Sequence, residues 1–269
     1  MAGNPATEAR RAASDLERTP AFRMLARTGY AVAGVLHAVI GVIAISIGLH
    51  AGGGRADQTG ALRSIAQAPG GILLVWAMIV GLVALGLWQV ARAITTSDRD
   101  GRAVWRSRAS AIGQAIGYLA LGVLAITVAV SGGGGDDRTL TARVLGAPGG
   151  VVLLVAIGLA ILGAGSYFVW RGIARKFLED LVPEPGPVTG VTEIVGMVGY
   201  IAKGVALGVL GVLYVVAAVT ADPDQAGGLD QAFQALTRVP FGEVLVVLIG
   251  AGFIAYGVYC VFRARYARL

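Results

Sequence analysis

The stretch GYIAKGVALGVLGVLYVVAAV, residues 199–219, carries a single charged side chain, Lys203. An α-helix needs about 20 apolar residues to cross the hydrocarbon core of a bilayer. Lipid offers the backbone no hydrogen-bond partners, so such a run must satisfy its own polar groups as a helix. The stretch therefore predicts a membrane-spanning helix.

Working outward from this stretch, we find six apolar runs of spanning length in the chain. With 56% hydrophobic and only 14% charged residues, the composition excludes an ordinary soluble domain, which is about 25% charged. The 41 glycines follow no Gly-X-Y period, which excludes collagen, and the high hydrophobicity excludes disorder. We predict an all-α integral membrane protein with six transmembrane helices, near residues 28–49, 71–92, 109–131, 149–171, 193–219 and 241–263.

The seven residues that open the quoted stretch recur in the other odd-numbered runs. GYIAKGV has counterparts in GYAVAGV in the first run and GYLALGV in the third. Three ordered copies are hard to attribute to composition, so they indicate an internal repeat. The shared residues are Gly29, Tyr30 and Gly34, then Gly117, Tyr118 and Gly122, then Gly199, Tyr200 and Gly204.

The even-numbered runs share a second signature, G-x-[WY]-x-V-x-R. Its copies are GLWQVAR, GSYFVWR and GVYCVFR, and each run is preceded by PGG, PGG or PFG. The first and last positions of the signature are Gly86 and Arg92, Gly165 and Arg171, and Gly257 and Arg263.

The two signatures together define a unit of two helices that enters and leaves on the same side of the membrane. Three such units in parallel predict three hairpins around a pseudo-threefold axis along the membrane normal. We expect a basic N-terminal segment over residues 1–27, then repeats over residues 28–95, 104–176 and 191–265.

The distribution of Lys and Arg predicts the orientation. Sixteen lie in the two termini and the loops after the second and fourth runs, and five lie in the alternate loops. Because cytoplasmic loops carry the excess of positive charge, both termini are expected in the cytoplasm, with the basic residues near anionic headgroups. No basic run is interleaved with aromatic residues, so we expect no nucleic-acid partner.

Short amphipathic stretches flank the spans. ALRSIAQAP at 61–69 and LDQAFQALTRVP at 229–240 predict helices lying on the outer surface, and residues 21–27 predict a basic surface segment on the other side. The prolines that follow the outer stretches are expected in the first turn of the next helix.

The repeated residues have two possible roles each. Small residues allow close helix packing in lipid, and the alternative is a mobile or pore-lining face. Arg92, Arg171 and Arg263 can complement the helix dipole and reach headgroups, and the alternative is a substrate-binding triad around the axis.

Lys203 and His37 are the candidate intramembrane polar site. Ionisable groups inside a membrane are a functional hypothesis by default. On superposed repeats His37 lies four positions after the equivalent of Lys203, which predicts one shared helix face. Lys203 could instead extend to the membrane surface, and His37 could bond a backbone carbonyl.

The chain lacks the motifs of known catalytic sites. There is no HExxH, GxSxG, Walker loop, dinucleotide fingerprint or CxxC, so we expect no catalytic residues, metal site or cofactor. The two histidines are 13 residues apart, too far for both to ligate one haem from a single helix.

The combined signatures resemble the bacterial membrane family known as domain of unknown function 1206. Residues 199–205 match its GYxAKGV motif best, whereas the first two repeats have Ala33 and Leu121 at the basic position. The resemblance covers about residues 22–265 and implies three two-helix units in a bacterial inner membrane, with no activity attached.

Three functions stay open. The first is a binding, scaffold or accessory protein that packs its small-residue faces against another membrane protein or a second copy. The alternative is a small-ion channel or transporter that uses Lys203 and His37. A membrane enzyme has the least support. Transporter sites usually show several buried polar groups, which are scarce here.

Overall fold

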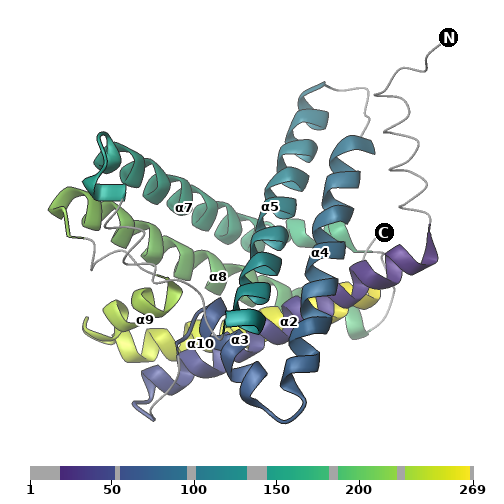
Figure 1. The fold of residues 1–269 in the computed structure, drawn as a ribbon, viewed down its shortest axis with the longest axis horizontal. Coiled ribbons are helices and arrows are strands. Elements are labelled where there is room, and N and C mark those ends of the chain that lie inside the picture. Colours follow the sequence, from purple (N-terminus) through teal and green to yellow (C-terminus); the bar gives the residue numbers. More distant parts are fainter. Residues whose placement is uncertain are drawn as a thin grey trace.

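The computed structural model describes residues 19–51, 55–95, 101–131, 144–181, 187–222 and 228–266, and most of these residues are helical. Six helices in these ranges are long and apolar enough to cross a membrane, which confirms the predicted all-α integral membrane fold (Figure 1). They are α2 (Pro20–Gly48), α4 (Gly71–Thr95), α5 (Gly101–Ser131), α7 (Gly150–Ile173), α8 (Pro187–Thr220) and α10 (Gly242–Tyr266).

The most extensive helix pairs join different repeats. They are α10 with α2, α7 with α8, and α4 with α5. The pairs within one repeat, α2 with α4 and α8 with α10, pack less extensively. The first helix of each hairpin is therefore held chiefly by the second helix of the hairpin before it, and the third hairpin returns to the first.

The ring of helices is open on one side. Among the described residues, α5 and α7 scarcely touch, although they belong to the same repeat. In Figure 1 the pair α4–α5 and the pair α7–α8 diverge at a wide angle. The structure is therefore a three-hairpin assembly with an α5–α7 opening, and full pseudo-threefold packing stays a prediction.

Signature glycines lie where the helices of different repeats come closest. A methyl carbon added to Gly165 would lie 2.7 Å from the carbonyl oxygen of Gly204, and one added to Gly34 would lie 2.7 Å from that of Gly257. A second glycine layer follows seven residues along each helix, pairing Gly158 with Gly211 and Gly41 with Gly250.

The remaining cross-repeat pair, α4 with α5, lacks this second layer. Its equivalent positions hold Ile79 and Ala129, and a methyl carbon on Gly122 would meet its neighbours only at ordinary van der Waals distances, the nearest atom belonging to the side chain of Val83 at 3.4 Å. The bulkier residues hold these two helices further apart, which accounts for the looser packing of α4 with α5.

The motif PGG, PGG or PFG forms the same turn in all three repeats. Its middle residue adopts a left-handed conformation, with φ of 73° at Gly70, 78° at Gly149 and 60° at Phe241. The turn brings the last glycine against a carbonyl oxygen six residues earlier, so a Cβ there would overlap it. The prolines lie in this turn, before the helix, rather than in the first helical turn as expected.

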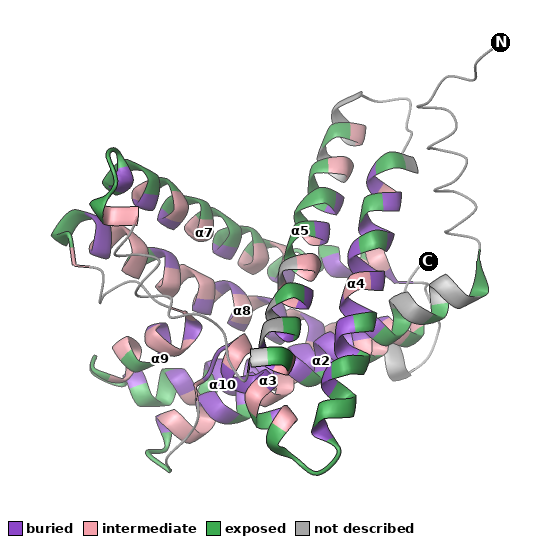
Figure 2. Ribbon diagram, viewed as in Figure 1, coloured by how far each residue is buried: buried purple, intermediate pink, exposed green. Residues whose placement is uncertain are grey.

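Two amphipathic helices cover the end of the bundle opposite the arginines. They are α3 (Gln58–Gln67) and α9 (Leu229–Thr237), and both match the predicted surface stretches. Leu62 and Phe233 pack into the core formed mainly by α2, α4 and α10. Figure 2 shows burial concentrated in this region, while α7 is largely exposed. The predicted surface segment 21–27 is instead the continuous start of α2.

Asp230 joins α9 to the loop before α3. Its carboxylate accepts hydrogen bonds from the backbone N–H of Ala56, at 2.9 Å, and from Gln234, at 2.7 Å. Burial raises the pKa of Asp230 above its ordinary 3.8, the hydrogen bond from Ala56 opposes this shift, and the charge of Asp57 adds to it. The contact therefore links the loop before α3 in the first repeat with α9 in the third repeat.

The raised pKa makes a pH-dependent prediction for Asp230→Asn. An acid whose pKa is raised by folding stabilises the fold below its unfolded-state pKa, and this contribution is lost as pH rises through the folded-state pKa. Asparagine keeps one acceptor oxygen for the backbone N–H of Ala56 and removes the charge. We therefore expect the thermal midpoint of Asp230→Asn, relative to wild type, to be higher at pH 7 than at pH 3.5. A difference that does not change with pH would contradict the assignment.

Candidate functional site

The structure brings Lys203 and His37 together from α8 and α2. Lys203 Nζ lies 3.1 Å from His37 Nε2, and His37 Nδ1 lies 2.6 Å from the carbonyl oxygen of Ala33. If Nδ1–H donates to this carbonyl, Nε2 is left as the acceptor for the ammonium. His37 therefore makes the backbone bond considered for it and also lies within contact distance of Lys203.

Aromatic rings enclose this lysine–histidine pair. Lys203 Nζ lies 4.5 Å from the ring centroid of Tyr256 and 5.1 Å from that of Phe168, and His37 stacks on Phe253. The faces of such rings attract a cation. Lys203 is only partly buried, whereas His37 is buried. The arrangement can hold one positive charge within the membrane.

A second charged group lies at the arginine-rich end and consists of Arg171, Arg263 and Asp180. Asp180 Oδ2 is 2.6 Å from Arg171 Nη2 and 3.0 Å from Arg263 Nη2. Arg263 is only 4% exposed, so its charge depends on this carboxylate. We call these three residues the arginine–aspartate cluster.

Asp180 reaches the cluster because of a short 3₁₀ helix, η1 (Lys176–Asp180). Phe177 of η1 is fully buried, stacks on Tyr200 with ring centroids 5.3 Å apart, and accepts a hydrogen bond on its carbonyl from Tyr259. Gly196 leaves room for the Phe177 ring. This anchor turns the chain back over the helix ends, which places Asp180 between two arginines.

The signature arginines lie over signature tyrosines of the next repeat. Arg263 of the third repeat lies 4.5 Å from the ring centroid of Tyr30 of the first, and Arg171 of the second lies 5.7 Å from that of Tyr200 of the third. The two signatures therefore meet across repeats. Arg171 and Arg263 share Asp180, whereas Arg92 lines a cavity together with Arg171 and Asp180.

Two polar features were not predicted from the sequence. One is Asp180, which lies outside the spans and outside both signatures, so the repeat gave no signal for it. The other is the pair Gln89 and Gln114, with Nε2 of the first donating to Oε1 of the second at 2.6 Å across α4 and α5. Gln89 is fully buried within its span, and its polarity in an apolar run was the available signal.

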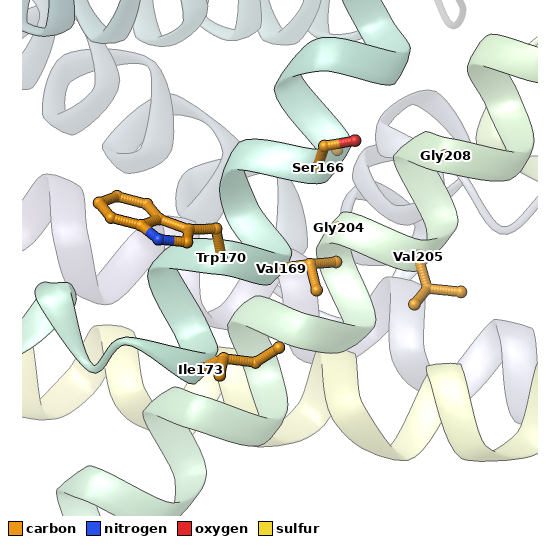
Figure 3. A pocket seen from close by; sticks show the side chains of 8 residues that line it. Ser166, Val169, Trp170, Ile173, Gly204, Val205 and Gly208 are labelled. Atoms are coloured by element: carbon orange, nitrogen blue, oxygen red, sulfur yellow. The ribbon is translucent and has the colours of Figure 1, made fainter.

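Two hollows border α7. A groove of about 460 Å³ runs along α7 and α8 over Gly165, Gly204 and Gly208, and Figure 3 shows Ser166 as the polar side chain on an otherwise apolar wall. A larger cavity of about 740 Å³ lies between α5 and α7 at the arginine-rich end of the opening. We call it the α5–α7 cavity.

Comparison with known proteins agrees with the repeated architecture. The profile described as Domain of Unknown Function (DUF1206) matches residues 28–96, 109–175 and 198–267. A curated relative is the uncharacterized protein YxxB of Bacillus subtilis (strain 168), which is 27% identical over 260 residues that cover 94% of each chain. No solved structure matches. This chain, a polytopic membrane protein with three tandem copies of the unit, belongs to the DUF1206 family.

Proposed function

We propose that this protein is a membrane-embedded binding protein and that the α5–α7 opening holds a second membrane component. The supporting observation is that this one hairpin is open while its two counterparts are packed. In lipid, helices associate through close packing of small residues rather than through a hydrophobic driving force. The hairpins of the first and third repeats are packed, and the hairpin of the second repeat is open. We expect this pattern of a scaffold that has one binding site.

The open hairpin carries the same small residues as the closed ones. Gly29 packs on Gly81 of its own repeat, and Gly199 packs on Tyr256 of its own repeat. The equivalent Gly117 has no described atom within 4 Å of an added methyl carbon. Ala160 and Ala164, at the positions facing it in the repeat alignment, are exposed. These surfaces suit an occupant with apolar groups.

A photo-crosslinking residue at Gly117 tests this proposal. In intact membranes we expect it to give one defined adduct by mass spectrometry. The matched control is the same residue at Val219 of α8, which is 75% exposed and should give the bulk lipid mixture. Two outcomes would contradict the proposal: the same mixture of bulk-lipid adducts at both positions, or an adduct between the residue at position 117 and α7.

The proposal takes the arginine-rich end to face the cytoplasm, as the distribution of basic residues predicts. A cysteine introduced in α3 should then react from outside intact cells with an impermeant maleimide.

A second candidate function, movement of a proton or small ion, is favoured by the contact of Lys203 with His37. This function requires that the wild-type protein gives a flux in proteoliposomes and that Lys203→Met and His37→Ala each abolish the flux. Wild-type protein that gives no flux above protein-free vesicles removes this candidate.

A further inference from the structure

Several cationic side chains line the α5–α7 cavity. Arg92, Arg171 and Lys176 line it together with the carboxylates of Glu179 and Asp180. Its volume of about 740 Å³ lies within the range of ligand sites, roughly 300–1,000 Å³. The lining therefore combines a ligand-sized space with a concentration of N–H donors.

Among the described residues that line the cavity, three cationic side chains accompany two carboxylates. Glu179 pairs with Lys176 at 2.8 Å, but Asp180 is shared between Arg171 and the buried Arg263. Two guanidinium groups on one carboxylate leave a net positive charge beside the cavity. Moreover, Nε of Arg171 is buried and has no hydrogen-bond acceptor among the described residues. Both observations point to an anionic acceptor.

Aromatic side chains also line the cavity. Trp105 is 71% exposed and Trp170 is 53% exposed, and both line the cavity beside Tyr167. Such amphipathic rings are typical of the level at which lipid headgroups meet the hydrocarbon. Further along α5 lie exposed apolar side chains such as Ile116. An amphiphile with an anionic headgroup is a ligand that fits the cationic, the aromatic and the apolar side chains of this region.

We propose that the α5–α7 cavity binds the phosphate headgroup of an anionic phospholipid whose acyl chains lie in the α5–α7 opening. This rests on the proposed binding function and names its ligand class. Guanidinium groups bind phosphate oxygens through paired, charge-assisted hydrogen bonds, and an ammonium adds a point charge. Arg92 and Lys176 contact the headgroup, while Arg171 is held in place by Asp180.

Ligand-dependent thermal stability of the purified full chain in a neutral detergent tests the proposal. A ligand that binds the folded state raises the thermal midpoint. We expect phosphatidylglycerol to raise it in a saturable way, with phosphatidylcholine of the same acyl chains and inorganic phosphate giving no comparable rise. Equal shifts with both lipids would overturn the proposal, and a shift with inorganic phosphate as large as that with the lipid would overturn its lipid source.

Single-residue variants test whether phosphatidylglycerol binds at this cavity. Arg92→Gln and Lys176→Gln should each weaken the apparent affinity for phosphatidylglycerol about tenfold, in line with losing one charge-assisted contact. Arg238→Gln, the same charge change at an exposed position at the other end, should leave it unchanged. Equal weakening by all three would show a diffuse charge effect and would contradict the site. A defined adduct at Gly117 without this lipid selectivity would leave the binding function standing and remove only the lipid assignment.

Discussion

Asp180→Ala is expected to lower the free energy of unfolding by about 3–5 kcal/mol, because it leaves a buried arginine without its carboxylate. Arg263 loses its ion pair at 3.0 Å, and its side chain is only 5% exposed to solvent. Arg171, which shares the same carboxylate oxygen, loses its contact in the same step. The measurement is denaturant or SDS unfolding in mixed micelles, followed by circular dichroism.

The neighbouring acid supplies the control for this variant. Glu179 pairs with Lys176, and both side chains are largely exposed, at 67% and 46%. Exposed ion pairs contribute about 0–1 kcal/mol, so Glu179→Ala should have little effect. Losses of similar size for the two variants would show that the arginine–aspartate cluster does not hold the helix ends together.

Gly165→Ala is expected to destabilise the protein by about 1–3 kcal/mol through overpacking. The added methyl carbon would lie 2.7 Å from the carbonyl oxygen of Gly204 and 2.9 Å from the backbone nitrogen of Gly208, so α7 and α8 would have to move apart. We expect this loss of stability although alanine favours a helix over glycine by about 1 kcal/mol. The same unfolding measurement in micelles reports it.

Gly163, two residues earlier on α7, provides the matched comparison. It is exposed, and no described atom lies within 4 Å of an added methyl carbon. Gly163→Ala should therefore leave stability unchanged or raise it slightly through helix propensity. If both alanine variants behave alike, close packing of glycines does not set the α7–α8 interface.

Much of the fold was predictable because its signals are local. Six apolar runs give six helices, and the amphipathic stretches give α3 and α9. The repeats indicated small residues suited to close helix packing, but not which helices they bring together. Gly34 packs on Gly257 and Gly204 packs on Gly165, so in these two pairs the signature of the first helix meets the second-helix signature of the preceding hairpin, with the third hairpin preceding the first. Sequence spacing fixes a helix face, whereas the partner of that face depends on the whole assembly.

The candidate site was predictable only in part. Superposing the repeats placed Lys203 and His37 on equivalent helix faces, but it did not predict that Nζ of Lys203 on α8 and Nε2 of His37 on α2 lie 3.1 Å apart. The aromatic rings around them come from α7 and α10, which no alignment of α2 with α8 could supply. Asp180 was not predicted because it belongs to η1, which has no counterpart in the repeat signatures. The buried Phe177 anchors η1 and so places Asp180 beside Arg171 and Arg263.

The sequence by itself determined the class of protein, the six helices, the triplicated unit and the positions where helices can come close. These follow from the apolar length required by lipid and from residues whose role repeats. Only the tertiary structure decided that the α5–α7 hairpin is open and that a cavity with excess positive charge lies at its arginine-rich end. Small residues permit helix contact in every repeat alike. Whether contact forms depends on how the cross-repeat pairs set the angle between α4–α5 and α7–α8, and this is a property of the whole assembly.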